Sequence, residues 1–85
     1  MIRALTGYPS RRADYIAAHA QGWVAQGAQL QALREQAGVS RTALARALGV
    51  SAARVARLEQ GLPVRDARLL RAAIILFLER KGEKN

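Results

Sequence analysis

The stretch Arg41–Gln60, RTALARALGVSAARVARLEQ, constrains the fold of this chain more than any other. Its apolar side chains recur at the three- and four-residue spacing of a helix on both sides of Gly49, which interrupts the pattern. Ser40 precedes the first segment and Ser51 the second, and a serine hydroxyl there accepts a hydrogen bond from the free amides of a helix's first turn. The stretch therefore predicts two short helices joined by a tight turn.

The rest of the chain predicts further helices and no strand. We expect a break near Gly27, because glycine costs about 1 kcal/mol relative to alanine inside a helix. Gly38 is expected to end the following helix, because glycine adopts the left-handed conformation that closes one. The expected helices are about Ser10–Gln26, Ala28–Ala37, the segment from the cap Ser40 to about Leu48, Ala52–Gln60 and about Arg65–Lys81.

These elements predict an all-α fold: a small helical bundle of about five helices with a helix-turn-helix at about residues 40–60. Residues 1–9 are expected to form a flexible N-terminal arm, because Gly7 and Pro9 interrupt the helical periodicity. Residues 10–81 would then form a single domain, followed by a short tail at 82–85. A chain of 85 residues is long enough for one small core and not for a deep pocket.

Composition argues against several classes of function. The chain has no cysteine, one histidine and six scattered acidic residues, so neither a metal site nor a catalytic constellation is apparent, and we expect no enzyme and no cofactor. The longest apolar run, Ala72–Leu78, has seven residues, where a membrane span needs about 20. We expect a cytoplasmic bacterial protein with no membrane contact and no evident small-molecule effector.

The charge indicates a polyanionic partner. Lysine and arginine number 14 against six acidic residues, which gives a net charge of +8. Twelve of the 14 cations are arginine, whose planar fork grips a phosphate or a guanine edge through two hydrogen bonds. No aromatic residue lies between Trp23 and Phe77, whereas binders of single strands expose aromatics for base stacking. Double-stranded DNA is therefore the expected partner.

The helix Ala52–Gln60 is the candidate DNA-reading element. Its helical geometry turns Val55 and Leu58 inward and leaves the opposite side free for a partner. The alanines on that side are small enough to approach base edges in the major groove, and Arg57 has the reach to bond guanine. Arg54, on the flank, could reach a base or a phosphate. The expected base contacts are Ala52, Ala53, Arg54 and Arg57.

Phosphate contacts are expected around the helix N-termini, where free amides and the helix dipole attract anions. The candidates are Ser40, Arg41, Thr42, Ser51, Gln60 and Arg65. For the residues at the N-termini the alternative role is simple capping and solubility, and for Ser40 capping is the preferred role.

The stretch from about Leu30 to Leu76 resembles the lambda-repressor-like (Cro/XRE-type) helix-turn-helix regulators. The matching residues stand at fixed offsets: Leu44-Ala45, Gly49, Val55 and Leu58, flanked by LREQAGVS and LEQGLP. The resemblance implies that the two motif helices cross closest at Ala45. It also implies an ion pair between Arg34 and Glu59 with a structural role.

The chain departs from that family at one point. Well-known phage members have glutamine at the positions of Arg41 and Ala52, where one glutamine supports the other against an adenine. Because neither glutamine is present, the operator sequence cannot be inferred from the resemblance. The size, the charge and the single DNA-binding domain are also similar to those of plasmid-borne Kor-type repressors.

The last predicted helix, about residues 65–81, is apolar around most of its circumference, so it must cover two surfaces. One is the core. The other is either a second subunit, with Leu70, Ile74, Phe77 and Leu78 as the dimer interface, or the helix that carries Tyr15 and Trp23. A homodimer could read two half-sites about 34 Å apart.

We therefore expect a transcriptional repressor that binds a palindromic operator as a homodimer. The alternative is an antitoxin-type protein that binds DNA and also a partner protein, because residues 1–27 could form a partner-binding segment. Activation of transcription is not distinguished from repression by any residue.

Overall fold

The computed structural model describes residues 2–83, with side chains over residues 12–82. It contains four helices: α1 (Ile2–Gln36), α2 (Arg41–Leu48), α3 (Ala52–Gln60) and α4 (Ala67–Glu83). No strand occurs in this described part of the chain. The all-α prediction is confirmed, but the expected number of about five helices is corrected to four.

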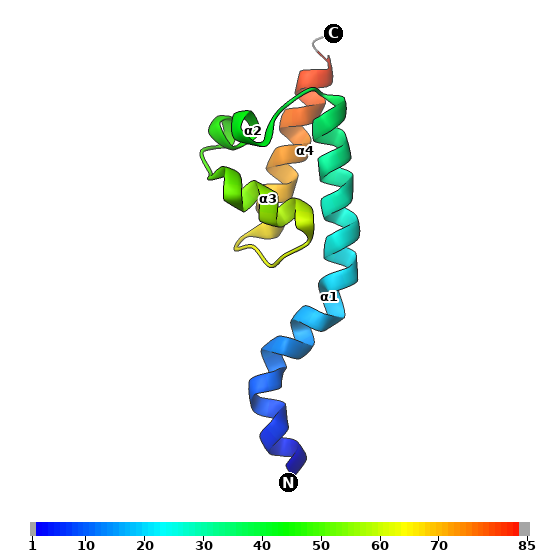
Figure 1. Cartoon of the computed structure of the whole chain (residues 1–85), viewed down its shortest axis with the longest axis vertical. Coiled ribbons are helices and arrows are strands. Elements are labelled where there is room, and N and C mark those ends of the chain that lie inside the picture. Colours follow the sequence, from blue (N-terminus) through cyan, green and yellow to red (C-terminus); the bar gives the residue numbers. More distant parts are fainter. Residues whose placement is uncertain (1, 84–85) are drawn as a thin grey trace.

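The correction lies in α1, which is continuous through Gly27 (Figure 1). The predicted break was wrong because Gly27 faces the end of α3: a Cβ atom there would overlap the carbonyl oxygens of Leu58 and Glu59. The glycine permits a close approach between two helices, and its cost in helix propensity is offset by packing. Residues 2–9, expected as a flexible arm, also belong to α1.

The two central helices have the predicted bounds and caps. The Ser40 hydroxyl accepts from the amide of Ala43 at 3.0 Å, and the Ser51 hydroxyl accepts from the amide of Arg54 at 3.1 Å. Gly49 ends α2 with φ of 74°, in the left-handed region that favours glycine. The helix-turn-helix prediction is therefore confirmed at the level of single caps.

α4 begins at Ala67, two residues later than predicted. Asp66 has a positive φ of 55°, so the chain turns there before the helix starts. The Asp66 carbonyl accepts a hydrogen bond from the Leu70 amide at 2.9 Å and so begins the helical ladder.

One apolar core joins all four helices, and α1 packs along α3 and α4 (Figure 1). The first part of α1 projects beyond this bundle, so the molecule is elongated, with extents of 61 × 21 × 16 Å. The core residues are Leu30, Val39, Leu44, Ala45, Val55, Leu58, Leu70, Ile74 and Leu78.

The core contains three of the four residues expected at a dimer interface. Leu70, Ile74 and Leu78 are 6%, 1% and 5% exposed within a single chain, and Phe77 is half-buried against them. Leu70, Ile74 and Leu78 therefore have almost no surface left for a partner, which corrects that assignment. The apolar surface that α4 leaves exposed is on its other side, at Leu69 and Leu76.

Within residues 2–83, no helix combines the length and the apolar composition that crossing a bilayer requires.

Candidate nucleic-acid interface

The outer side of α3 is open to a partner. Val55 and Leu58 are buried, as predicted. Ala53, Arg57 and Gln60 lie on the opposite side of the helix and are exposed to solvent. Arg54 and Ala56 are half-buried beside them. Ala52 is also half-buried and packs against the core, so only part of its surface can meet a base edge.

The two arginines of α3 lean toward the loop that connects α3 to α4. Arg57 donates from Nη2 to the Pro63 carbonyl at 3.2 Å, and Arg54 donates from Nη2 to the Arg65 carbonyl. Both bonds are exposed to solvent, where water competes for the same donor and acceptor. A base edge or a phosphate can therefore replace either carbonyl at small cost.

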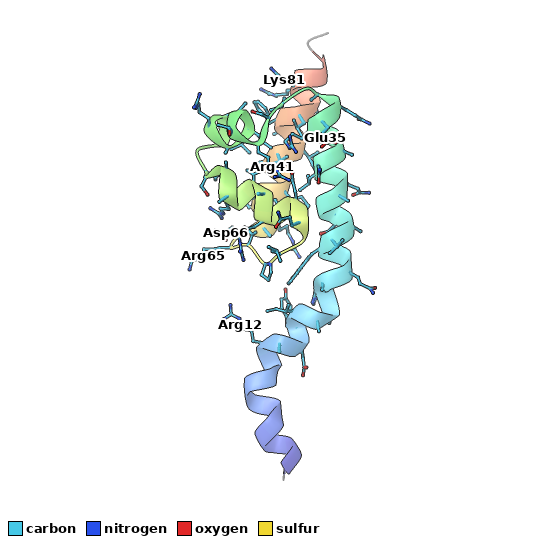
Figure 2. The ribbon with its side chains drawn as sticks, viewed as in Figure 1. Arg12, Glu35, Arg41, Arg65, Asp66 and Lys81 are labelled. Carbon is cyan, nitrogen blue, oxygen red and sulfur yellow. The ribbon has the colours of Figure 1, made fainter. Side chains whose placement is uncertain are left out.

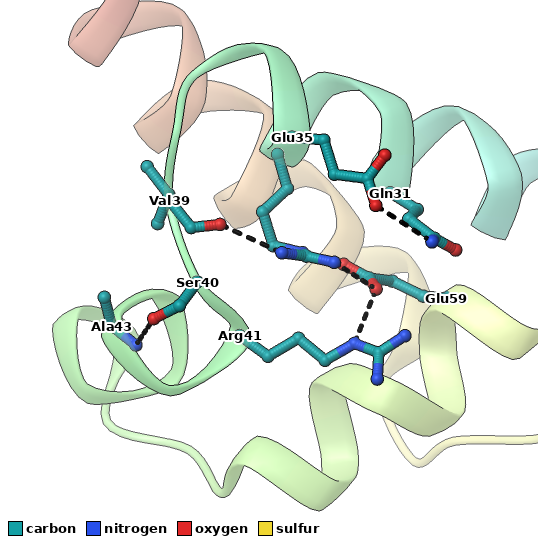
Figure 3. Close-up of polar contacts among 8 residues, drawn as sticks. Gln31, Glu35, Val39, Ser40, Arg41, Ala43 and Glu59 are labelled. Atoms are coloured by element: carbon teal, nitrogen blue, oxygen red, sulfur yellow. Dashed lines mark hydrogen bonds and ion pairs between the residues drawn. The ribbon is translucent and has the colours of Figure 1, made fainter.

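A buried carboxylate joins α3 to α1 and to the start of α2 (Figure 3). The side chain of Glu59 is only 1% exposed, and its Oε2 accepts from Arg34 Nε at 2.6 Å while its Oε1 accepts from Arg34 Nη2 at 3.2 Å. This is the ion pair that the resemblance implied. Arg34 Nη1 also donates to the Val39 carbonyl at 2.9 Å, which ties the loop before α2 to the same cluster.

Sequence reasoning missed the third member of this cluster. Arg41 Nε donates to Glu59 Oε1 at 2.8 Å, so one carboxylate serves two guanidinium groups and the cluster keeps one positive charge. In the sequence, Arg41 directly follows the cap of α2 and Glu59 is the residue before the last of α3, so 18 residues separate them. Only the crossing of the helices brings them together.

Arg41 is fixed and still accessible. Its side chain is 37% exposed, and its terminal nitrogens make no hydrogen bond within the described part of the chain. Arg34 is mainly buried, and the hydrogen bonds that it donates to Glu59 raise the pKa of its guanidinium against the opposing effect of burial. Arg34 therefore holds Glu59 in place, while Arg41 presents positive charge at the molecular surface.

The remaining predicted phosphate contacts lie around this surface. Ser40 and Ser51 cap their helices, which confirms the preferred role of Ser40. Thr42 and Gln60 are exposed at opposite ends of the helix pair, and Arg65 is exposed in the loop beyond α3 (Figure 2). All of them stay predictions as contacts to DNA.

A second concave surface lies on the α1 side of α3, where Leu58 contributes to its lining. An open groove of about 650 Å³ separates the middle of α1 from the loop before α4. Tyr15, His19 and Trp23 line it as an aromatic ladder, with ring centroids 4.2 Å apart for the first pair and 5.7 Å apart for the second. Their spacing of four residues places them on one side of a helix. No cluster of three or more potential metal ligands occurs among the residues described.

Both α2 and α3 are capped, a left-handed glycine lies between them, and the open side of α3 carries arginines. This arrangement defines a helix-turn-helix DNA-binding unit. Residues 26–76, more than half of the chain, match the family described as "Helix-turn-helix domain". The chain belongs to that family. No curated protein and no solved structure matches it.

Proposed function

We propose that this protein is a lambda-repressor-like transcriptional repressor that binds a palindromic operator in double-stranded DNA as a homodimer. The observation that supports this most is the open outer side of α3, where small alanines alternate with Arg54 and Arg57. A helix with that profile fits a major groove about 12 Å wide. Arg57 bonds guanine, and the methyls of exposed Ala53 and half-buried Ala52 meet thymine methyls.

The phosphate contacts of this proposal surround the helix. Arg41 grips the backbone with the terminal nitrogens that Glu59 leaves free, and the backbone amides near Thr42 and Ser51, at the helix N-termini, donate hydrogen bonds to phosphate oxygens. Gln60, at the C-terminal end of α3, and Arg65, in the loop that follows, also contact the phosphate backbone. These contacts fix the register of α3 and carry no sequence information themselves.

A dimer supplies the affinity that one short helix cannot. α3 has only nine residues and offers few base contacts, whereas two copies related by a two-fold axis read half-sites about 34 Å apart. Occupation of a promoter by such a dimer blocks RNA polymerase. The protein then works in the cytoplasm, bound to the nucleoid.

The test is a mobility-shift titration with the protein's own upstream region and with random duplex of equal length. We expect tighter binding to the upstream region, and a logarithm of the affinity that falls by about 0.9 per log unit of salt for each neutralised phosphate. Equal affinity for both duplexes at every salt concentration would overturn sequence-specific repression.

The second candidate is an antitoxin-type protein. It is favoured by the projecting part of α1 and by the groove lined by the Tyr15–Trp23 ladder, which together offer a surface that includes none of the predicted base contacts. Purification from the native host separates the candidates. A stoichiometric second protein supports the antitoxin, and self-association alone supports the plain repressor.

A further inference from the structure

The outer side of α4 carries an apolar stripe that no part of the described chain covers. Leu69 and Leu76 are 71% and 58% exposed, and they lie seven residues apart, which places them two turns apart on one side of the helix. Ala72 is exposed between them. We call these three residues the outer stripe.

The outer stripe lies opposite the side of α4 that completes the core. Leu70, Ile74 and Leu78 take that buried side, against α1, α2 and α3. Leu69, Ala72 and Leu76 follow one another along one side of the helix, so their apolar surface is contiguous, which is the arrangement that marks interaction sites. The side chain at the middle of the stripe is a small alanine, so a second helix can approach closely there.

Two charged residues show which partner fits. Arg68 and Glu79 are exposed near opposite ends of the stripe, and a rotation of 100° per residue puts both on the same flank of α4. Neither forms an ion pair with any described side chain. A partner helix that runs antiparallel and carries the same sequence would present Glu79 to Arg68 and Arg68 to Glu79.

A parallel copy would not satisfy these charges. Arg68 and Glu79 are 11 residues apart, which separates them by about 16 Å along a helix, so a parallel partner in register leaves each far from its opposite charge. A two-fold axis perpendicular to α4 near Ala72 satisfies both pairs at once, because a closed dimer uses the same patch on each subunit.

We propose that two copies of this chain pair through the outer stripes of their α4 helices in antiparallel orientation. Leu69 of each copy packs on Leu76 of the other, and Arg68 pairs with Glu79. This proposal rests on the homodimer of the proposed function and specifies its interface and the relative orientation of the two α4 helices. Because α1, α2 and α3 all pack on the other side of α4, both helix-turn-helix units stay on the outside of the dimer.

The chain has no cysteine, so single cysteines give a direct test of orientation. In the antiparallel pair Leu69→Cys faces Leu76→Cys, whereas two copies of either variant hold their thiols about 10 Å apart along the helices, beyond the Cα separation of about 7 Å that a disulfide allows. We expect an equal mixture to form a mixed disulfide dimer under mild oxidation, and each variant alone to remain uncrosslinked. Disulfide dimers from each variant alone would show a parallel pair and overturn the proposal.

Sedimentation equilibrium of the full chain tests the surface itself. We expect a mass of twice 9.2 kDa for the natural protein and a dimer dissociation constant raised at least tenfold by Leu69→Glu with Leu76→Glu. Tyr15→Glu is the matched control, a change of an equally exposed apolar residue on α1 that leaves the dimer intact. Dissociation by Tyr15→Glu but not by the double variant would place the interface on α1 and overturn the proposal.

A charge swap completes the test and separates this proposal from the proposed function. Arg68→Glu and Glu79→Arg should each weaken the dimer, and the two together should restore it. DNA binding is measured in parallel on a duplex with a single half-site. If the natural protein binds that duplex but sediments as a monomer, the antiparallel pair is wrong and DNA binding stands. If it binds no duplex, the proposed function fails whatever its mass.

Discussion

At the scale of single residues, Glu59 connects stability with DNA binding. Its carboxylate is buried, neutralises Arg34 inside the bundle and holds Arg41 at the surface. A carboxylate with two cationic partners is fully paired, whereas Arg34 without it would be a buried charge with no counter-charge. The raised pKa of Arg34 adds stability that is present at lower pH and lost only as the pH rises through that raised pKa, so it does not vary at the pH of DNA-binding assays.

The first prediction follows from this cluster. Glu59→Gln should lower the free energy of unfolding by about 3 kcal/mol or more, because breaking a buried pair leaves Arg34 uncompensated. Arg41→Ala should cost less than about 1 kcal/mol, because its side chain is partly exposed and Arg34 keeps its partner. Urea unfolding of both variants checks this. Equal losses of unfolding free energy in the two variants would contradict the view that the buried pair of Arg34 and Glu59 dominates the stability of the cluster.

A second prediction contrasts two arginines on the DNA side. Arg57→Ala should weaken binding to the operator by about 1–3 kcal/mol while changing random-duplex binding much less, because a guanine contact discriminates between bases. Arg41→Ala should weaken binding to all duplexes alike and reduce the salt slope by about 1, because a phosphate contact carries no sequence information. Mobility-shift titrations measure both. Identical losses for Arg57→Ala on both duplexes would contradict the base contact.

At the scale of the elements, local signals were predictable and tertiary ones were not. The caps at Ser40 and Ser51 act on their own first turns, so the sequence alone located both helices of the motif. The close approach at Gly27 depends on α3, which lies far along the chain, and so a glycine that permits packing was taken for a helix break. The buried side of α4 was misassigned for the same reason.

The third prediction compares Gly27 with Gly22, two of the glycines of α1. Gly27→Ala should destabilise the protein by about 1–3 kcal/mol, because the added methyl would overlap the backbone of Leu58 and Glu59. Gly22→Ala is the matched control: no atom lies within 4 Å of its added methyl, so helix propensity should stabilise the protein by about 0.5–1 kcal/mol. Thermal unfolding followed by circular dichroism gives both values. A neutral Gly27→Ala would disprove the close helix contact.

At the scale of the whole molecule, charge and shape divide the surface into regions. The net charge of +8 favours binding of a polyanion, and the open side of α3 is the surface at which we expect that polyanion to bind. The base-contact candidates were accessible to sequence reasoning because a helix has only one side opposite its buried residues. The link between Arg41 and Glu59 and the aromatic groove were not accessible, because each arises from how helices cross. A second apolar side of the last helix was predicted, but its residues were not, because which side of α4 is buried depends on the other helices.

The central claim is that the outer side of α3 reads bases in the major groove, and methylation-interference footprinting of the protein's upstream region tests it most directly. Dimethyl sulfate methylates guanine N7 in the major groove and adenine N3 in the minor groove. The account predicts interference at guanine N7 in two half-sites about 34 Å apart, with adenine N3 between them neutral. Interference at adenine N3 alone, with guanine N7 methylation tolerated throughout, would contradict it.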